Sequence, residues 1–386
     1  MKTFSTSTRS WFFAILLGGL AIGYPTDANL AQAQTAPKYR VDASWPKQLP
    51  NDWAMGQIGG MAVDQDDHIW VFQRPRSLTA DETAAAQTPP TAECCFPAPS
   101  VLEFDAEGNL LKSWGGPNYI PDWPQSEHGI YIDRAGNVWL SGSGAPGQVE
   151  KGAPEDREVF KFTNDGKLLL TIGHPFRGPD NNQDTTMLGR VAAIEVDDDA
   201  HEVFLADGYG NRRVVVYDSN TGAFKRGWGA YGIPLTEIDN GKAAAYDPSA
   251  PTSKQFLGPV HSVRISRDGL VYACDRTADR IQVFTKQGKF IKEFLLAPKT
   301  LGNGSTWSVN FSHDPGQQYL LVGDGRNNVI WIVSRNDGTV LGSFGHNGRN
   351  AGQFHWVHQV VMDSKGNVYT GEVDTGKRIQ KFVLQK

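Results

Sequence analysis

Three histidines occupy one position in alternating copies of an internal repeat. His128, His261 and His358 each lie five residues before a polar residue that recurs in every copy. Three neutral imidazoles with an open fourth position form the usual ligand set of a catalytic zinc ion, and nitrogen ligands also suit copper, iron or nickel. The alternative is that each imidazole only makes a hydrogen bond. Because three of nine histidines share this position, the pattern favours a metal site, and His68 and the other five receive no role.

Two arginines and a tyrosine are expected at the same rim of the fold. Arg74, Tyr209 and Arg276 each come at the end of a strand-like run. An arginine there can bind a carboxylate through two parallel hydrogen bonds. A tyrosine normally titrates near pH 10, and beside an arginine and a metal ion it can ionise and act as a base. The alternative for each residue is a salt bridge or a packing contact at the rim.

The repeat itself predicts the fold. Each copy has an inner strand ending in a polar residue, a second strand ending in Asp or Glu, and two further strands joined by an Xaa-Gly turn, with alternating residues typical of β-structure. The polar residues align as six copies: Asp64, Asp133, Asp197, Ser266, Ser312 and Asp363. A four-stranded blade needs about 40–50 residues. We therefore predict an all-β, six-bladed β-propeller with NHL-like four-stranded blades, rather than a linear β-solenoid.

Two features complete the predicted ring. The sixth copy ends after its third strand, and residues 39–42 are predicted to supply the missing outer strand, which closes the ring and protects its edges. The early copies carry inserts at residues 77–99, 142–157 and 230–258, which are predicted to be loops where binding function tends to lie. Cys94 and Cys95, in the first insert, pair with each other or one pairs elsewhere. Cys274 is predicted to be a small core residue.

The N-terminal residues are predicted to direct export of the remaining chain. A basic start, a short apolar run and a polar stretch ending in small residues predict a signal peptide over residues 1–33, with an uncleaved anchor as the alternative. Residues 34–386 are predicted to be one domain, exported to the periplasm or secreted, and monomeric. The net charge of −5, with both signs interspersed, indicates no nucleic-acid partner and no membrane partner after cleavage.

Several short motifs resemble one known family. They are Ser126-Glu127-His128-Gly129, Asp207-Gly208-Tyr209-Gly210-Asn211-Arg212, Pro259-Val260-His261-Ser262, Asp275-Arg276 and Val357-His358. In order and identity they resemble peptidyl-α-hydroxyglycine α-amidating lyase, over roughly residues 45–382. The resemblance implies a catalytic zinc on the three histidines, Tyr209 as the catalytic tyrosine, and Arg74 and Arg276 beside it. It also implies a structural calcium ion, and a carboxylate-bearing small-molecule or peptide substrate, a peptidyl-α-hydroxyglycine, that is split into an amide and glyoxylate.

The sequence also departs from this family. Gln359 stands where the family has an aspartate that binds calcium, and a neutral amide is a weaker ligand for a hard cation. Trp356 stands in place of a methionine, which is expected to reshape the substrate pocket, and Gly210 in place of a cysteine, which removes a disulfide. We therefore expect the substrate to be a peptidyl-α-hydroxyglycine or a similar α-hydroxy amide. The alternatives are a non-enzymatic exported NHL-repeat binding propeller and a propeller lactonase or hydrolase.

Overall fold

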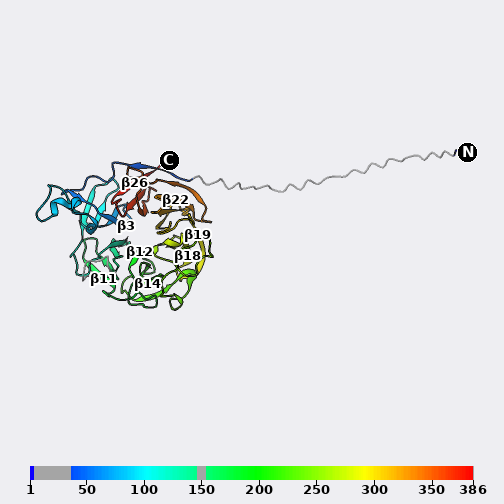
Figure 1. Cartoon of the computed structure of the whole chain (residues 1–386), viewed down its shortest axis with the longest axis horizontal. Coiled ribbons are helices and arrows are strands. Elements are labelled where there is room, and N and C mark those ends of the chain that lie inside the picture. Colours follow the sequence, from blue (N-terminus) through cyan, green and yellow to red (C-terminus); the bar gives the residue numbers. More distant parts are fainter. Residues whose placement is uncertain (4–35, 146–153, 386) are drawn as a thin grey trace. The chain divides into compact units, whose positions relative to one another are not determined.

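The repeat folds as a ring of antiparallel sheets. The computed structural model describes residues 1–3, 36–145 and 154–385, and the residues from Ala36 onward form one compact unit (Figure 1). Within these residues there are six four-stranded sheets. The predicted six-bladed propeller is therefore confirmed. Most of the predicted signal peptide, at residues 4–33, lies outside the described residues.

Each blade runs from an inner strand at the ring axis to an outer strand at the periphery. Blades one to three contain, in this order, β3 (Gln57–Val63), β4 (Ile69–Arg74), β6 (Val101–Phe104) and β7 (Leu110–Trp114); β8 (Glu127–Ile132), β9 (Val138–Gly142), β10 (Glu158–Phe162) and β11 (Leu168–Gly173); and β12 (Val191–Asp197), β13 (Glu202–Asp207), β14 (Arg213–Asp218) and β15 (Phe224–Trp228).

Blades four to six follow the same order. They contain β16 (Val260–Ile265), β17 (Leu270–Asp275), β18 (Arg280–Thr285) and β19 (Phe290–Leu295); β20 (Ser308–Phe311), β21 (Tyr319–Asp324), β22 (Val329–Ser334) and β23 (Val340–Phe344); and β24 (Val357–Met362), β25 (Val368–Glu372), β26 (Ile379–Gln385) and β1 (Lys38–Asp42). The pairing of β1 with β26, with Val41 opposite Phe382, confirms the predicted ring closure.

Among the described residues, only short elements lie outside the six blades. The strands β2 (Trp53–Ala54) and β5 (Phe96–Pro97) pair in parallel. The helices of the described residues are 3-10 turns: η1 (Pro75–Ser77), η2 (Asp81–Ala86), η3 (Ala230–Gly232), η4 (Leu235–Glu237) and η5 (Arg276–Ala278). None of these helices is long and apolar enough to cross a membrane. In the first insert Cys94 and Cys95 form a disulfide with each other, and Cys274 is buried in β17.

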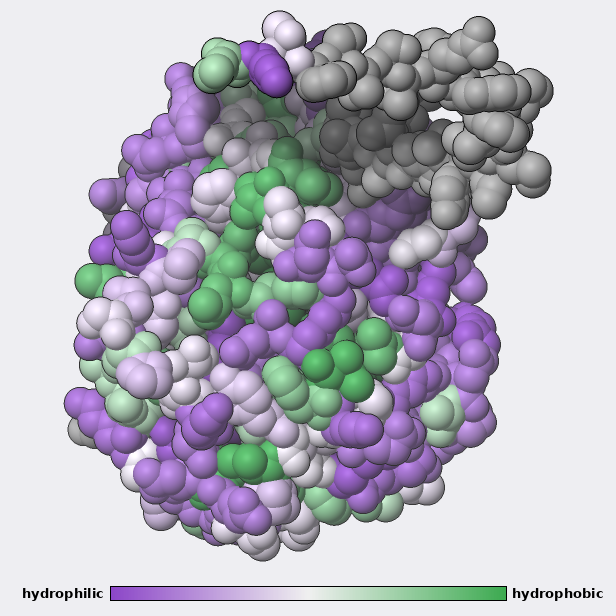
Figure 2. Space-filling view, turned by 90° about the vertical axis from the view of Figure 1, so that its right-hand side faces the viewer, coloured by the Kyte–Doolittle hydropathy of each residue, from purple (hydrophilic) through white to green (hydrophobic). Residues whose placement is uncertain are grey.

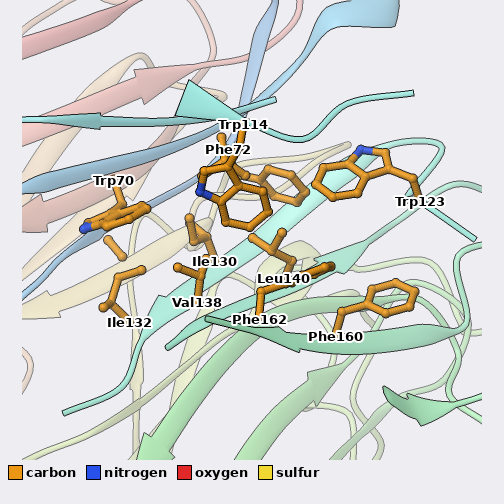
Figure 3. Packing of buried hydrophobic residues seen from close by; sticks show 12 residues of the cluster. Trp70, Phe72, Trp114, Trp123, Ile130, Ile132, Val138, Leu140, Phe160 and Phe162 are labelled. Atoms are coloured by element: carbon orange, nitrogen blue, oxygen red, sulfur yellow. The ribbon is translucent and has the colours of Figure 1, made fainter. Parts of the chain in front are cut away.

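Hydrophobic side chains fill the space between neighbouring blades. In Figure 3, Trp70 and Phe72 of β4 pack with Ile130 of β8 and Leu140 of β9, and this cluster joins blades one and two. Because each sheet has a neighbour on both faces, polar positions such as Glu103, Glu195 and Gln282 are buried as well. Figure 2 shows an outer face that is mainly hydrophilic, with hydrophobic residues in smaller groups between. The core therefore lies between blades and holds the inner strands in place.

The inner strands of blades one and two approach each other closely. Gly59 and Gly60 of β3 lie against the backbone of β8. A Cβ atom added at Gly59 would lie 2.0 Å from the Glu127 carbonyl oxygen, and one added at Gly60 would lie 2.3 Å from the His128 carbonyl oxygen. Backbone atoms cannot move aside as a flexible side chain can, so only glycine permits this spacing.

We expect Gly60→Ala to destabilise the fold by about 1–3 kcal/mol, because the new methyl group overlaps the β8 backbone. The measurement is urea unfolding followed by tryptophan fluorescence. Gly316→Ala is the matched control, since its added Cβ would meet no atom closer than 3.5 Å. Equal stability of the two variants would contradict the close packing of β3 on β8.

Candidate metal centre

Three imidazoles meet at the centre of the ring. His128, His261 and His358 are the second residues of the inner strands β8, β16 and β24, and their exposed fractions are 0%, 1% and 2%. Their ring centroids are 5.1, 4.8 and 4.9 Å apart in pairs, and one nitrogen of each lies within 4.8 Å of those of the other two. The shared repeat position thus brings three residues, far apart in sequence, to one point.

Backbone carbonyl groups of the following blade orient each imidazole. His128 Nδ1 lies 2.7 Å from the Ala192 carbonyl oxygen, and His358 Nδ1 lies 3.1 Å from that of Ile58. His261 Nδ1 bonds in the same way to the carbonyl oxygen of Trp307. A carbonyl only accepts hydrogen bonds, so each Nδ1 must carry the proton and each neutral ring keeps its lone pair on Nε2. This arrangement is typical of histidines that bind metals.

Burial keeps these rings neutral. Removal from water lowers the pKa of His128, His261 and His358 well below the ordinary value, and the positive charges of Arg74 and Arg276 act in the same direction. A neutral imidazole is the form that coordinates a metal ion. The three rings therefore present lone pairs, not charges, to the centre of the ring.

The Tyr209 hydroxyl group lies in the same space. Its oxygen is 2.9 Å from His128 Nε2 and 2.9 Å from His261 Nε2. The hydroxyl has one hydrogen, so it can donate to only one of these two acceptors at a time. One of the two Nε2 lone pairs therefore receives no hydrogen from Tyr209, and a bound cation would satisfy it.

Two buried ion pairs hold the turns that carry Tyr209 and the neighbouring Arg276. Asp207, at the end of β13, binds Arg213, and Asp275, at the end of β17, binds Arg280; all four side chains have no exposed surface. Each pair closes the connection between the second and third strands of its blade. The turn then places its polar side chain at the mouth of the ring.

The two arginines expected beside Tyr209 take different positions. Arg276 lies against it, with Nη1 3.4 Å from the hydroxyl oxygen and the guanidinium 5.7 Å from the ring centroid. Arg74 instead donates from Nε to the Glu127 carbonyl oxygen at 2.7 Å and from Nη1 to Gln57 at 2.9 Å. Its charge still acts on the His128 ring. Arg276 is therefore in the Tyr209 cluster, while Arg74 borders it.

A tryptophan that sequence reasoning did not single out forms one wall of the centre. The Trp307 ring lies 5.8 Å from the rings of both His261 and His358, and 4.5 Å below the Arg276 guanidinium. Trp356 continues the wall outward, 5.5 Å from Trp307. Trp307 stands five residues before Ser312, the position that holds histidine in blades two, four and six, but its sequence position does not reveal that its ring and its carbonyl group both face the histidines.

Tyr209 lines a cleft with a volume of about 590 Å³. One wall includes Pro179, Asp180 and Asn182, and a second wall includes residues 240–243. The second wall belongs to the third insert predicted from the sequence. A ligand that reaches Tyr209 can therefore extend into a polar cleft between two loops.

The residues fit zinc and do not fit calcium. Tetrahedral zinc requires ligand nitrogens about 3.3 Å apart, and three neutral, preoriented imidazoles within 4.8 Å of one another need only small movements to reach that spacing. Gln359, in contrast, donates from its amide nitrogen to the Gly59 carbonyl oxygen at 3.1 Å. Calcium needs oxygen ligands at such a position, whereas here an amide group already satisfies the carbonyl.

Known proteins similar in sequence include lyases of the expected kind. Peptidyl-alpha-hydroxyglycine alpha-amidating lyase 1 of Drosophila melanogaster is 25% identical over 366 residues, which is 89% of this chain and 60% of that protein. Peptidyl-glycine alpha-amidating monooxygenase B of Xenopus laevis is 24% identical over 345 residues, 86% of this chain. This chain spans about a third (34%) of the length of that monooxygenase.

Other similarities concern the architecture. NHL repeat-containing protein 3 of Mus musculus is 26% identical over 365 residues, 90% of this chain and 84% of that protein. A solved streptogramin B lyase structure superimposes with a TM-score of 0.53 at 13% identity, over 90% of this chain and 98% of that one, which supports the fold alone. No protein-family model matches the chain. The chain is thus a distant relative of the peptidyl-α-hydroxyglycine α-amidating lyases and of NHL-repeat proteins, as its motifs predict.

Proposed function

We propose that this chain is a zinc-dependent lyase. Its substrate is a peptidyl-α-hydroxyglycine or a similar α-hydroxy amide, which it cleaves at the C–N bond to give an amide and glyoxylate. The observation that carries the proposal is the convergence of His128, His261, His358 and the Tyr209 hydroxyl on one point. The sequence similarity to proteins named as α-amidating lyases supports the same reaction.

Proton transfer through Tyr209 accounts for the chemistry. A zinc ion held by the three histidines supplies Lewis acidity that favours loss of a proton from a hydroxyl group. In the reactive form the Tyr209 oxygen is an anion stabilised by Arg276, 3.4 Å away, and it accepts the proton of the substrate's α-hydroxyl group. The α-carbon becomes the aldehyde carbon of glyoxylate, the C–N bonding electrons move to nitrogen, and Tyr209 returns the proton to that nitrogen.

The surrounding residues bind and orient the substrate. Arg276, with Arg74 at the border of the cluster, supplies positive charge for the substrate carboxylate. Trp307 covers the side of the histidines and excludes water from that side. The cleft beside Tyr209 is open to the acyl or peptide part of the substrate. We also propose that the protein is exported, to the periplasm or beyond, and acts as a monomer.

A binding propeller without catalytic activity is the second candidate. The similarity to NHL repeat-containing protein 3 covers 84% of that protein, whose name states the repeat and no reaction. Such a protein would place no demand on the residues around Tyr209. Kinetic measurements on site variants therefore separate the two functions.

The first prediction concerns the metal. We expect His358→Ala to bind one zinc ion fewer per chain than the wild type, because two imidazoles are too few for the site. The measurement is elemental analysis of purified protein after dialysis against metal-free buffer. His174→Ala is the control, since His174 is exposed and bonds only to the neighbouring Pro175 carbonyl oxygen. Equal zinc content in His358→Ala and the wild type would contradict a zinc ion on the three histidines.

The second prediction concerns proton transfer. We expect Tyr209→Phe to lower kcat about 100-fold or more while the zinc content stays unchanged, because the ring remains and only the hydroxyl group is lost. Glyoxylate released from an N-acyl-α-hydroxyglycine is the readout. Tyr131→Phe serves as the control, since Tyr131 bonds to the Val196 carbonyl oxygen in another part of the channel. Wild-type turnover in Tyr209→Phe would exclude Tyr209 from the chemistry.

The third prediction concerns calcium. We expect millimolar CaCl2 to leave the Tm of the wild type unchanged, whereas Gln359→Asp should gain a calcium-dependent rise of about 2 °C or more, because a carboxylate then faces the Gly59 carbonyl oxygen. Gln359→Asn is the neutral control. A calcium-dependent Tm in the wild type would show that the amide does not replace the ion.

A further inference from the structure

Three blades share one hydrogen-bonding unit at the far end of their inner strands, away from the central histidines. In each, the aspartate that ends the inner strand accepts a hydrogen bond from an aromatic residue of the second strand. The pairs are Trp70 to Asp64 at 2.8 Å, Trp139 to Asp133 at 3.1 Å and Tyr369 to Asp363 at 3.1 Å. These blades therefore allow a residue-by-residue comparison within one chain.

The third strand carries a lysine beside the aromatic residue in two of the three blades. Lys161 pairs with Trp139 in blade two, and Lys381 pairs with Tyr369 in blade six. The Lys161 ammonium lies 3.4 Å from the Asp133 carboxylate. In blade one the residue that pairs with Trp70 is Glu103. Of these three blades, blade one alone therefore carries a negative charge at this position.

The turn residue changes together with the third strand. Asn137 and Asn367 donate from their amide groups to the aspartates of blades two and six. The matching residue of blade one is His68. Its Nδ1 lies 2.9 Å from Glu103 Oε1 and 3.6 Å from Asp64 Oδ2. Where the sister blades have an amide and an ammonium group, blade one therefore has an imidazole and a second carboxylate.

Protein hydrogens do not satisfy this arrangement fully. The single hydrogen that His68 can carry on Nδ1 serves one carboxylate, and the distances assign it to Glu103. Lys112, on the strand next to Glu103, directs its ammonium group to Asn164 and Asp165 of blade two, although its positive charge still acts to lower the pKa of Glu103. Asp64 Oδ2 receives the Trp70 hydrogen bond and keeps acceptor capacity toward His68. Two carboxylates with one imidazole retain negative charge even when the imidazole is protonated.

We propose that Asp64, His68 and Glu103 bind a divalent transition-metal ion, with zinc as the reference ion. One ligand atom of each lies within 4.8 Å of the others. The nitrogen–oxygen distances of 2.9 and 3.6 Å bracket the edge of a tetrahedral zinc site, about 3.3 Å. The side chains of Asp64 and Glu103 are 11% and 7% exposed, whereas that of His68 is 32% exposed, which leaves access and room for a water ligand.

The ion supplies the positive charge that Lys161 supplies in blade two. It neutralises the two carboxylates and joins the turn after β3 to the third strand of blade one. That turn also contacts blade six, where Ser364 donates from its amide and hydroxyl groups to Asp67 at 2.8 and 2.6 Å. The ion therefore stabilises blade one beside the point where the ring closes, independently of the central histidines.

The sister blades supply the variants that test this site. Glu103→Lys and His68→Asn introduce the residues that blades two and six carry, so the fold has a precedent for both. Equilibrium dialysis of the full-length protein against zinc, followed by elemental analysis, should give one ion fewer per chain in each variant than in the wild type. Circular dichroism melting checks that the variants are folded, and Glu103→Gln serves as a second variant of similar volume should Glu103→Lys not fold.

The background of His358→Ala separates this ion from the central one. One zinc ion should remain in His358→Ala and disappear in His358→Ala/Glu103→Lys, whether or not the lyase proposal holds. Zinc should also raise the Tm of His358→Ala but not that of the double variant. If His358→Ala and the double variant bind the same amount of zinc, the cluster is an ion pair only and the proposal is overturned.

Discussion

The central feature of this protein is the contact between inner strands of adjacent blades. Each of His128, His261 and His358 bonds through Nδ1 to a backbone carbonyl oxygen of the following blade. Those carbonyl groups belong to the odd-numbered blades, which have no histidine in the shared position. The odd blades thus orient the imidazoles that the even blades contribute. A change in the packing of the blades would therefore change the orientation of the imidazole rings.

Burial makes this contact chemically useful. The three rings lose their contact with water, so they stay neutral, and one nitrogen of each lies within 4.8 Å of those of the other two. The Tyr209 oxygen also lies at this point, and the Arg276 guanidinium lies next to it. A polar cluster of this kind is costly to bury unless its members are satisfied. The buried ion pairs behind Tyr209 and Arg276 fix the turns, so that the cluster keeps one geometry.

Repetition gives the molecule internal comparisons that a single-copy fold lacks. The same position holds an ammonium group in blades two and six and a carboxylate in blade one. The shared inner position likewise holds histidine in three blades and Gly59, Ala192 or Trp307 in the others. Where a blade departs from its neighbours at a buried polar position, the departure changes charge or ligand type at a fixed place in space. Such departures mark sites more clearly than composition does.

The sequence by itself determined the number of blades, the closing strand and the convergence of the three histidines. These follow from spacing, because equivalent positions in a closed ring face one axis. Only the tertiary structure decided the hydrogen-bond partners of the site residues. Arg74 and Arg276 occupy similar places in sequence, yet only Arg276 reaches Tyr209, because the Glu127 carbonyl group and Gln57 hold Arg74.

The same limit explains what sequence reasoning missed. The acceptors of the histidine rings are backbone atoms, which every residue possesses, so no residue type marks them in a sequence. In β18 the polar residues Arg280 and Gln282 alternate with apolar residues, yet both are fully buried, because a blade has a neighbour on each face. Spacing fixes which positions meet, whereas the contacts of neighbouring blades fix which atoms bond.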